Sequence, residues 1–137
     1  MAGAPLDAIR RVPLFAELDD DELAQVARLF KQRTFAPGET VAKEGSGGAA
    51  FYLIESGTAN VTVAGRERAA LGPGDYFGEI ALIDEGARSA TITAVEELVC
   101  YGLTFWDFRP LVQENAAICW KLLQFMVGRL RTAEAAA

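Results

Sequence analysis

The part of the sequence best suited to binding a charged small molecule runs from Gly74 to Ala94. It contains a glycine-containing turn, a short apolar run, an acidic loop and then Arg88, which leads into a β-branched stretch. The apolar run after Gly78 is long enough for a single helical turn, whose first backbone N–H groups have no intrahelical partner and can bind an anion. The guanidinium of Arg88 can close such a site with a charge-assisted, two-pronged contact.

Neighbouring residues of the same segment fit the rest of a nucleotide. Ser89 offers a hydroxyl donor directly after the arginine, and Ala90 is small enough to let its backbone N–H approach a ligand. Glu79 carries a carboxylate that accepts hydrogen bonds, so it suits a sugar hydroxyl and not a phosphate. One cation for phosphate and one acceptor for ribose describe a nucleotide whose phosphate and sugar lie close together.

The segment resembles the phosphate-binding cassette of cyclic-nucleotide-binding domains. That family includes the bacterial catabolite activator, protein kinase A regulatory subunits and cyclic-nucleotide-gated channels. The residues that carry the resemblance in this segment are Phe77–Leu82 and Arg88–Thr91. Other runs typical of the family follow its order along nearly the whole chain, and they are Leu14–Leu18, Gly38–Val41, Phe51–Gly57 and Gly74–Glu79.

The resemblance implies a role for each residue of the cassette. Glu79 would accept a hydrogen bond from the ribose 2′-hydroxyl, and Arg88 would pair with the cyclic phosphate. Gly78 would allow close backbone approach. Further phosphate contacts would come from one hydroxyl and three backbone N–H groups, those of Ser89, Ile80, Ala81 and Ala90.

The resemblance also implies a wall and a lid for the ligand. The barrel of the family would supply an apolar wall for the base, to which Val61 and Leu71 would belong. The last helix would act as a lid, with Arg129 and Leu130 near the base and ribose. Simpler interpretations stay open, because Val61 and Leu71 also fit a generic barrel core and Arg129 also fits a solvated helix face.

Hydrophobic spacing and turn signals predict one domain that is mainly β with flanking helices. Residues 1–30 are expected to form an N-terminal helical segment. Short strands between glycine-rich turns over residues 31–104 favour a sandwich or barrel, and the resemblance selects a small antiparallel β-barrel of the jelly-roll type with its phosphate-binding turn at 77–91. Residues 105–137 are expected to form the hinge and lid helices.

Two local features of the helical parts lead to further expectations. Asp19 and Glu22 have the spacing of a capping box at the start of a helix. Three large aromatic residues of the C-terminal part, Trp106, Trp120 and Phe125, are expected to pack between the helices and the barrel.

Charge and composition argue against several classes of function. The 137 residues carry a formal net charge of −6, so the surface repels a phosphate backbone and direct nucleic acid binding is not expected. The chain has no histidine, which removes Ser-His and Cys-His dyads and most zinc sites. We therefore predict no catalytic residue, no metal site and no cofactor, and a cupin-type metalloenzyme is disfavoured.

The cysteines and the apolar runs bear on the cellular compartment. Cys100 and Cys119 lie in apolar stretches and are expected to be buried, reduced thiols. Met1–Arg11 lacks the apolar core of a signal peptide, and no apolar run reaches membrane-spanning length. A cytoplasmic location without membrane association is expected.

The sequence therefore predicts a regulatory domain that binds a cyclic nucleotide, and not an enzyme. Cyclic AMP is the expected ligand, with binding transmitted through the C-terminal helix. Ser89 is ambiguous, because Ser or Thr after the cassette arginine can favour cyclic GMP, while bacterial cyclic-AMP receptors often carry Ser there. The alternatives are a cyclic GMP-selective domain and a degenerate domain that only dimerises or docks. The expected partners are a second copy of the chain, or a fused or associated effector domain.

Overall fold

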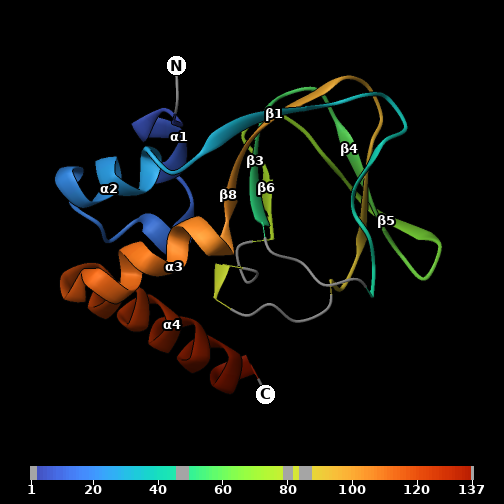
Figure 1. Ribbon diagram of the computed structural model, residues 1–137. Coiled ribbons are helices and arrows are strands. Elements are labelled where there is room, and N and C mark those ends of the chain that lie inside the picture. The colour runs from blue at the N-terminus through green and yellow to red at the C-terminus, as the bar shows by residue number, and fades with distance from the viewer. Residues whose placement is uncertain (1–2, 46–49, 79–81, 84–87, 137) are drawn as a thin grey trace.

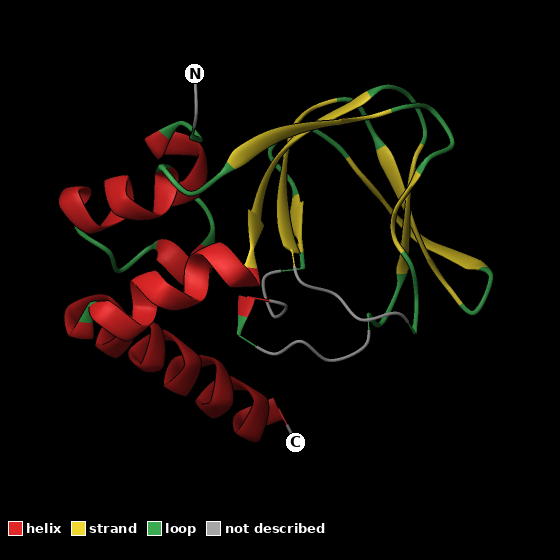
Figure 2. Ribbon diagram, viewed as in Figure 1, coloured by secondary structure: helices red, strands yellow, loops and turns green. Residues whose placement is uncertain are grey.

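The chain folds into two antiparallel sheets, with helices packed against one of them (Figures 1 and 2). The computed structural model describes residues 3–45, 50–78, 82–83 and 88–136. The helices, the first sheet and the second sheet follow one another as three layers, with the second sheet farthest from the helices. The expectation of a mainly β, jelly-roll type fold with flanking helices is confirmed.

Among the residues that the structure describes, each sheet contains four strands, and every strand pair is antiparallel. The first sheet has the order β1 (Lys31–Phe35), β8 (Leu98–Thr104), β3 (Ala50–Ser56) and β6 (Tyr76–Phe77). The second sheet has the order β2 (Thr40–Ala42), β7 (Thr91–Ala94), β4 (Ala59–Val63) and β5 (Arg66–Leu71).

Five helical elements flank the sheets in the described part of the chain. They are α1 (Leu6–Arg10), the 3₁₀ helix η1 (Pro13–Phe15), α2 (Asp20–Ala27), α3 (Phe105–Glu114) and α4 (Ala116–Ala136). The predicted capping box is confirmed, because the Asp19 carboxylate accepts from the Glu22 backbone N–H at 2.8 Å and the Glu22 carboxylate accepts from the Asp19 N–H at 2.9 Å.

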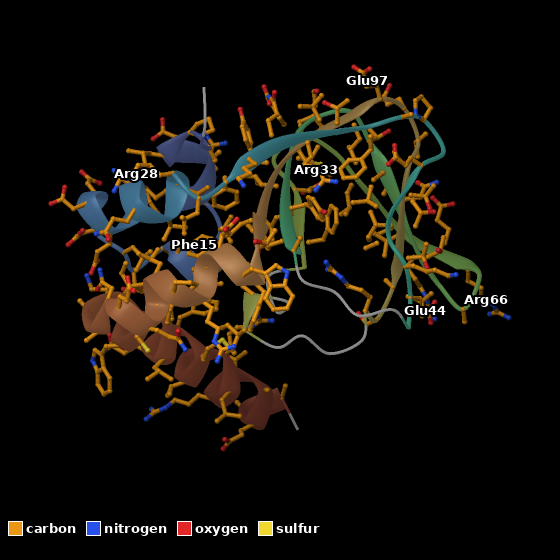
Figure 3. All side chains as sticks on the ribbon, in the orientation of Figure 1. Phe15, Arg28, Arg33, Glu44, Arg66 and Glu97 are labelled. Atoms are coloured by element: carbon orange, nitrogen blue, oxygen red, sulfur yellow. The ribbon has the colours of Figure 1, made fainter. Side chains whose placement is uncertain are left out.

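The alternating side chains of β3 divide the core in two. Phe51 and Leu53 face the helices, where the Phe51 ring packs edge-on against Phe15 with 6.1 Å between ring centroids. Figure 3 labels Phe15 within the helical layer. Tyr52 and Ile54 point the other way, into the apolar layer between the two sheets. Period-two alternation thus places one strand in both cores. The helical layer and the barrel interior share a wall.

A charged contact joins the two ends of the chain inside the helical layer. Lys121 of α4 donates a 2.5 Å hydrogen bond to the Glu22 carboxylate, which also completes the capping box of α2. Burial leaves Glu22 little solvent, so the ammonium replaces water as its partner. The hydrogen bond to Glu22 raises the pKa of Lys121 above its ordinary value, more than burial lowers it.

Three expectations on side-chain placement are wrong, namely those for Trp106, Trp120 and Cys119. Trp106 and Trp120 do not pack between helices and barrel, because 61% and 62% of their surface is exposed. Phe125 does pack against the helical core. Cys100 is buried and Cys119 is half-buried, and both are free thiols. The apolar spacing of a helix does not tell which of its apolar residues reach the core.

Among the described residues, no helix is long and apolar enough to cross a membrane. Within the same residues, no cluster of three metal-ligating side chains occurs.

Candidate ligand site

The strand register brings parts of the predicted cassette to one end of the two sheets. β3 begins at Ala50, and its partner β8 ends directly opposite at Thr104. β6 runs antiparallel to β3, so Gly78, which follows β6, lies at this end as well. Arg88 precedes β7 of the second sheet and reaches the same end. This end of the sheets is the candidate ligand site.

Arg88 is held at this end by its side chain and by its backbone. Its guanidinium donates a 2.5 Å hydrogen bond to the carbonyl oxygen of Ala50. Its own carbonyl accepts a 2.9 Å hydrogen bond from the N–H of Gly45. The residue is half-buried, so these contacts hold a long side chain that would otherwise sample many rotamers. Arg88 therefore links the first sheet to the second.

Among the described residues, no carboxylate forms an ion pair with Arg88. Burial lowers the pKa of the guanidinium, while its electrostatic interaction with Tyr52 acts in the opposite direction. The ion pairs of the described residues join Arg10 to Asp20 and Lys121 to Asp19 and Glu22, so none of those carboxylates neutralises Arg88. A guanidinium stays protonated at neutral pH, and one backbone carbonyl uses only one of its five donors. Its remaining donors suit an anion.

Gly78 meets the guanidinium where a side chain would not fit. Its φ of +84° lies in the left-handed region that glycine tolerates best. A Cβ added there would overlap Nη1 of Arg88 and come within 2.7 Å of the Ala50 carbonyl oxygen. The glycine is therefore required both by the backbone and by the arginine that packs over it.

The strand that follows Arg88 is braced by polar contacts. The Thr91 hydroxyl accepts from the Glu44 N–H at 2.9 Å, and the Glu44 carboxylate accepts from the Ala64 N–H at 2.9 Å. Figure 3 shows Glu44 and Arg66 close to one end of the second sheet, where the β4–β5 hairpin turns. Sequence reasoning missed Ala50 and Gly45. Both act through backbone atoms, so their residue types carry no signal of this role.

The other cassette residues are placed in different ways. Ser89 is exposed and Ala90 is half-buried, both in the bend between Arg88 and β7. Glu79, Ile80 and Ala81 lie outside the described residues, so their predicted contacts stay predictions.

The two predicted wall residues face the barrel interior. Val61 of β4 lies opposite Ile92 of β7, and Leu71 ends β5 opposite Ala59. Both are half-buried and pack against the apolar residues between the sheets. This position is compatible with a wall for a base and equally with ordinary core packing.

The predicted lid residues lie on the helical layer. The Arg129 guanidinium is 5.9 Å from the centroid of the Phe125 ring. Both residues line a cavity of about 290 Å³ together with Val12, Pro13, Leu14 and Tyr76. Leu130 is exposed. The structure thus brings Gly78, Arg88, Ser89 and Ala90 together, while Arg129 contacts residues of the helical layer.

Comparison with known proteins bears on the family and on the fold of this chain. A family model described as the cyclic nucleotide-binding domain matches residues 32–115. The crystal structure of the N-terminal domain of a transcriptional regulator from Streptomyces coelicolor A3(2) superposes with a TM-score of 0.85 at 34% identity, covering 96% of this chain and 94% of that one.

Two curated relatives are much longer than this chain. The cyclic AMP receptor protein of Thermus thermophilus is 35% identical over 127 residues, which are 89% of this chain and 59% of that protein. The cGMP-dependent protein kinase of Toxoplasma gondii is 40% identical over 92 residues, which are 67% of this chain and 9% of the kinase. The similarity to both is therefore a similarity to one part of each.

Proposed function

Because this chain belongs to the family of cyclic nucleotide-binding domains, we propose that it is a sensor that binds cyclic AMP in preference to cyclic GMP. Arg88 pairs with the cyclic phosphate, with Ser89 and the backbone N–H groups of Ile80, Ala81 and Ala90 as further donors. Glu79 accepts from the ribose 2′-hydroxyl. The role is one of binding and regulation, and it involves no covalent step.

The observation that carries this proposal is the state of Arg88. Within the part of the chain that the structure describes, the half-buried guanidinium of Arg88 donates to the carbonyl oxygen of Ala50 and lies against Gly78 at the end of the barrel. Keeping a cation in such a place is costly unless something compensates its charge. A cyclic phosphate supplies that charge locally, although the chain as a whole is acidic.

The preference for cyclic AMP draws its support from the extent of the similarity. The relative whose name states cyclic AMP matches over 127 residues. The relative whose name states cGMP matches over 92 residues. Ser89 does not separate the two ligands, so a cyclic GMP-selective domain is the alternative that the experiment has to address.

Paired calorimetric titrations of the purified chain with cyclic AMP, cyclic GMP and linear 5′-AMP test the proposal. We expect cyclic AMP to bind at least about tenfold more tightly than cyclic GMP, which corresponds to about 1.4 kcal/mol. Linear AMP should bind more weakly than either. Tighter binding of cyclic GMP would reverse the ligand assignment, and no binding of any cyclic nucleotide would favour the degenerate docking domain.

The same proposal includes a partner for the exposed stripe of α4. Trp120, Leu123, Val127 and Leu130 recur at alternating steps of three and four residues, and all are exposed. This spacing suits a two-helix seam. We expect the chain to dimerise through it. In sedimentation equilibrium Leu123→Glu should shift the chain to monomer, whereas Gln124→Glu, on an exposed neighbouring position, should not.

The proposed output is a change in α4 that an effector domain reads. The relatives are longer proteins of which this chain spans only a part. We therefore propose that this chain works with a fused or associated effector domain. A ligand moves a helix only if it binds more tightly to one helix position than to the other.

A further inference from the structure

A groove in the helical layer offers a second place for a ligand. It lies between α3, the N-terminal half of α4 and the pair Leu82 and Ile83, and Figure 1 shows α3 and α4 side by side. Its volume is about 520 Å³, within the range of pockets that hold a small organic molecule. Neither Gly78 nor Arg88 is among the described residues that line it, so the groove is distinct from the candidate ligand site.

The surface of this groove is mainly apolar. Phe108 and Leu122 line it and are buried in the helical core, so they form its floor. Ile83 and Leu123 line it as well, and 51% and 52% of their surface is exposed. Apolar side chains gathered at a concave surface mark a place where an apolar ligand removes them from water. The groove therefore favours a ligand with an apolar body.

One cation lies at the groove. Arg109 is the only charged residue among the described residues that line it. Its guanidinium lies 5.6 Å from the centroid of the Phe105 ring, and Phe105 also lines the groove, so the cation sits beside the apolar surface. None of the ion pairs among the described residues includes Arg109. Its donors suit a carboxylate, which can accept two parallel hydrogen bonds from a guanidinium.

A second polar side chain of the groove lies close to this cation. Gln113 is four residues after Arg109 on α3, so the two share one face of the helix, and both line the groove. The Gln113 amide provides two further N–H donors. The groove therefore combines a long apolar surface with a polar end that is built to receive an anion.

We propose that this groove binds a fatty acid, with the acyl chain on the apolar surface between α3 and α4 and the carboxylate on Arg109 and Gln113. The apolar lining disfavours a strongly polar molecule, since its polar groups would lose water without a partner. The chain has a formal net charge of −6, so a free anion is retained only where a local cation receives it. The proposal goes beyond the nucleotide sensor, because none of the described residues that line the groove is proposed to contact the nucleotide.

Calorimetric titration of the purified chain with hexanoate, octanoate and decanoate tests the acyl site. Each methylene that enters the groove leaves water, so the dissociation constant should fall about fourfold per added methylene. The titration contains no nucleotide, so its result does not depend on whether the chain senses cyclic AMP. Equal dissociation constants for the three acids, or no binding of decanoate, would overturn the proposal.

Alkylation of Cys119 locates the bound fatty acid. Cys119 lines the groove and is half-buried, whereas Cys100 lies in the apolar layer between the sheets. Saturating decanoate should slow the alkylation of Cys119 at least about fivefold and leave the rate at Cys100 unchanged, because only the first thiol is covered. Decanoate that binds without protecting Cys119 would lie elsewhere on the protein, which would overturn the assignment to the groove.

A charge variant tests the polar end. Arg109→Gln should raise the dissociation constant of octanoate about fivefold, as expected for a charge-assisted contact at an exposed position. It should leave the affinity for octanol unchanged, which also shows that the groove is intact. The matched control is Arg131→Gln, which removes the same charge from an exposed position of α4 outside the groove. Equal weakening in the two variants would assign the effect to net charge and overturn the carboxylate contact.

A second copy of the chain is the competing occupant, because Leu123 belongs both to the groove and to the exposed stripe of α4. Sedimentation equilibrium with and without saturating decanoate separates the two. A fatty acid in the groove should leave the association state unchanged. Dissociation of a dimer by decanoate would show that the partner copy fills the groove, and the proposal would fail.

Discussion

Arg88 and Ala50 stand 38 positions apart in the sequence, and the guanidinium of the first donates a 2.5 Å hydrogen bond to the carbonyl oxygen of the second. Ala50 pairs with Thr104 across β3 and β8, and the Thr104 hydroxyl caps α3 by accepting from the Asp107 N–H at 3.1 Å. Arg88, the residue proposed to bind phosphate, is thus connected through Ala50 and Thr104 to the N-terminus of α3. A ligand that draws Arg88 away from Ala50 acts on the strand end from which α3 begins.

Arg88→Ala should weaken cyclic AMP binding by about 2–4 kcal/mol, because a charge-assisted contact to a desolvated anion is lost. Arg88→Lys should recover only part of this, since an ammonium keeps the charge but not the planar fork. Calorimetry measures both. Arg66→Ala removes the same charge from the exposed β4–β5 hairpin and should leave affinity unchanged. Equal losses of affinity in Arg66→Ala and Arg88→Ala would assign the effect to the net charge of the protein and not to a specific contact of Arg88.

Gly78→Ala should impair both stability and binding, whereas Gly38→Ala should impair only stability. Both glycines have a φ of +84°, so alanine carries the same backbone strain of about 1–2 kcal/mol at either position. The added Cβ meets Arg88 at Gly78 and nothing within 4 Å at Gly38. We expect at least a tenfold weaker affinity for Gly78→Ala alone, about 1.4 kcal/mol. Chemical unfolding measures the stability of the two variants, and calorimetry measures their affinity for cyclic AMP. Equal affinities of Gly78→Ala and Gly38→Ala would show that Gly78 is not part of the site.

Glu79→Ala should abolish discrimination against a ribose without its 2′-hydroxyl. In the native chain, 2′-deoxy cyclic AMP should bind more weakly by about 1.5–3 kcal/mol, the range for a hydrogen bond to a charged group. The variant should bind the two ligands alike. A penalty that persists in Glu79→Ala would assign the 2′-hydroxyl to another acceptor.

The two cysteines should differ in reactivity in the native protein. Burial raises the pKa of Cys100 to about 11, whereas Cys119 is half-buried on α4. Alkylation requires the thiolate and access to it, so at pH 8 Cys119 should react at least about tenfold faster than Cys100. Mass spectrometry after timed alkylation measures both rates, and denaturant should bring them together. Faster reaction at Cys100 would show that the space between the sheets is open to solvent.

The same thiol gives a pH dependence of stability. An acid whose pKa is higher in the folded state loses its proton first in the unfolded chain. Stability should therefore fall as the pH rises from about 9, the ordinary value, toward about 11. Unfolding of Cys100→Ala over the same range provides the comparison, because the remaining titrating groups are shared. An equally steep fall in that variant would assign the effect to other groups.

The mainly β character of residues 31–104 and the stretch of sequence that resembles the cassette could be recognised because they leave local marks in the sequence. Glycine turns separate β-branched runs, and the cassette combines a glycine, an acid and an arginine in a short stretch. The strand β5 (Arg66–Leu71) leaves little such mark, since nearly all of its residues are exposed and half of them are charged. It forms a strand because β4 pairs with it.

The contacts that tie distant segments together could not be predicted. The acceptor that holds Arg88 is a backbone oxygen of an alanine, and every residue has such an oxygen. Lys121 and Glu22 are 99 positions apart, and neither residue type is unusual on an exposed helix face. The sequence predicts packing for Trp106 and Trp120, yet both are exposed, because the apolar character of a side chain does not say whether other residues cover it.

The double use of the Glu22 carboxylate limits how this domain can be cut or fused. One of its oxygens accepts from the Asp19 N–H at the first turn of α2 and also from the ammonium of Lys121 on α4, so the two helices share one acceptor. A biosensor that excises the barrel and discards either end would expose an acid and the apolar residues beneath it. Reporter proteins are therefore better attached after Ala136 than at the junction between α3 and α4.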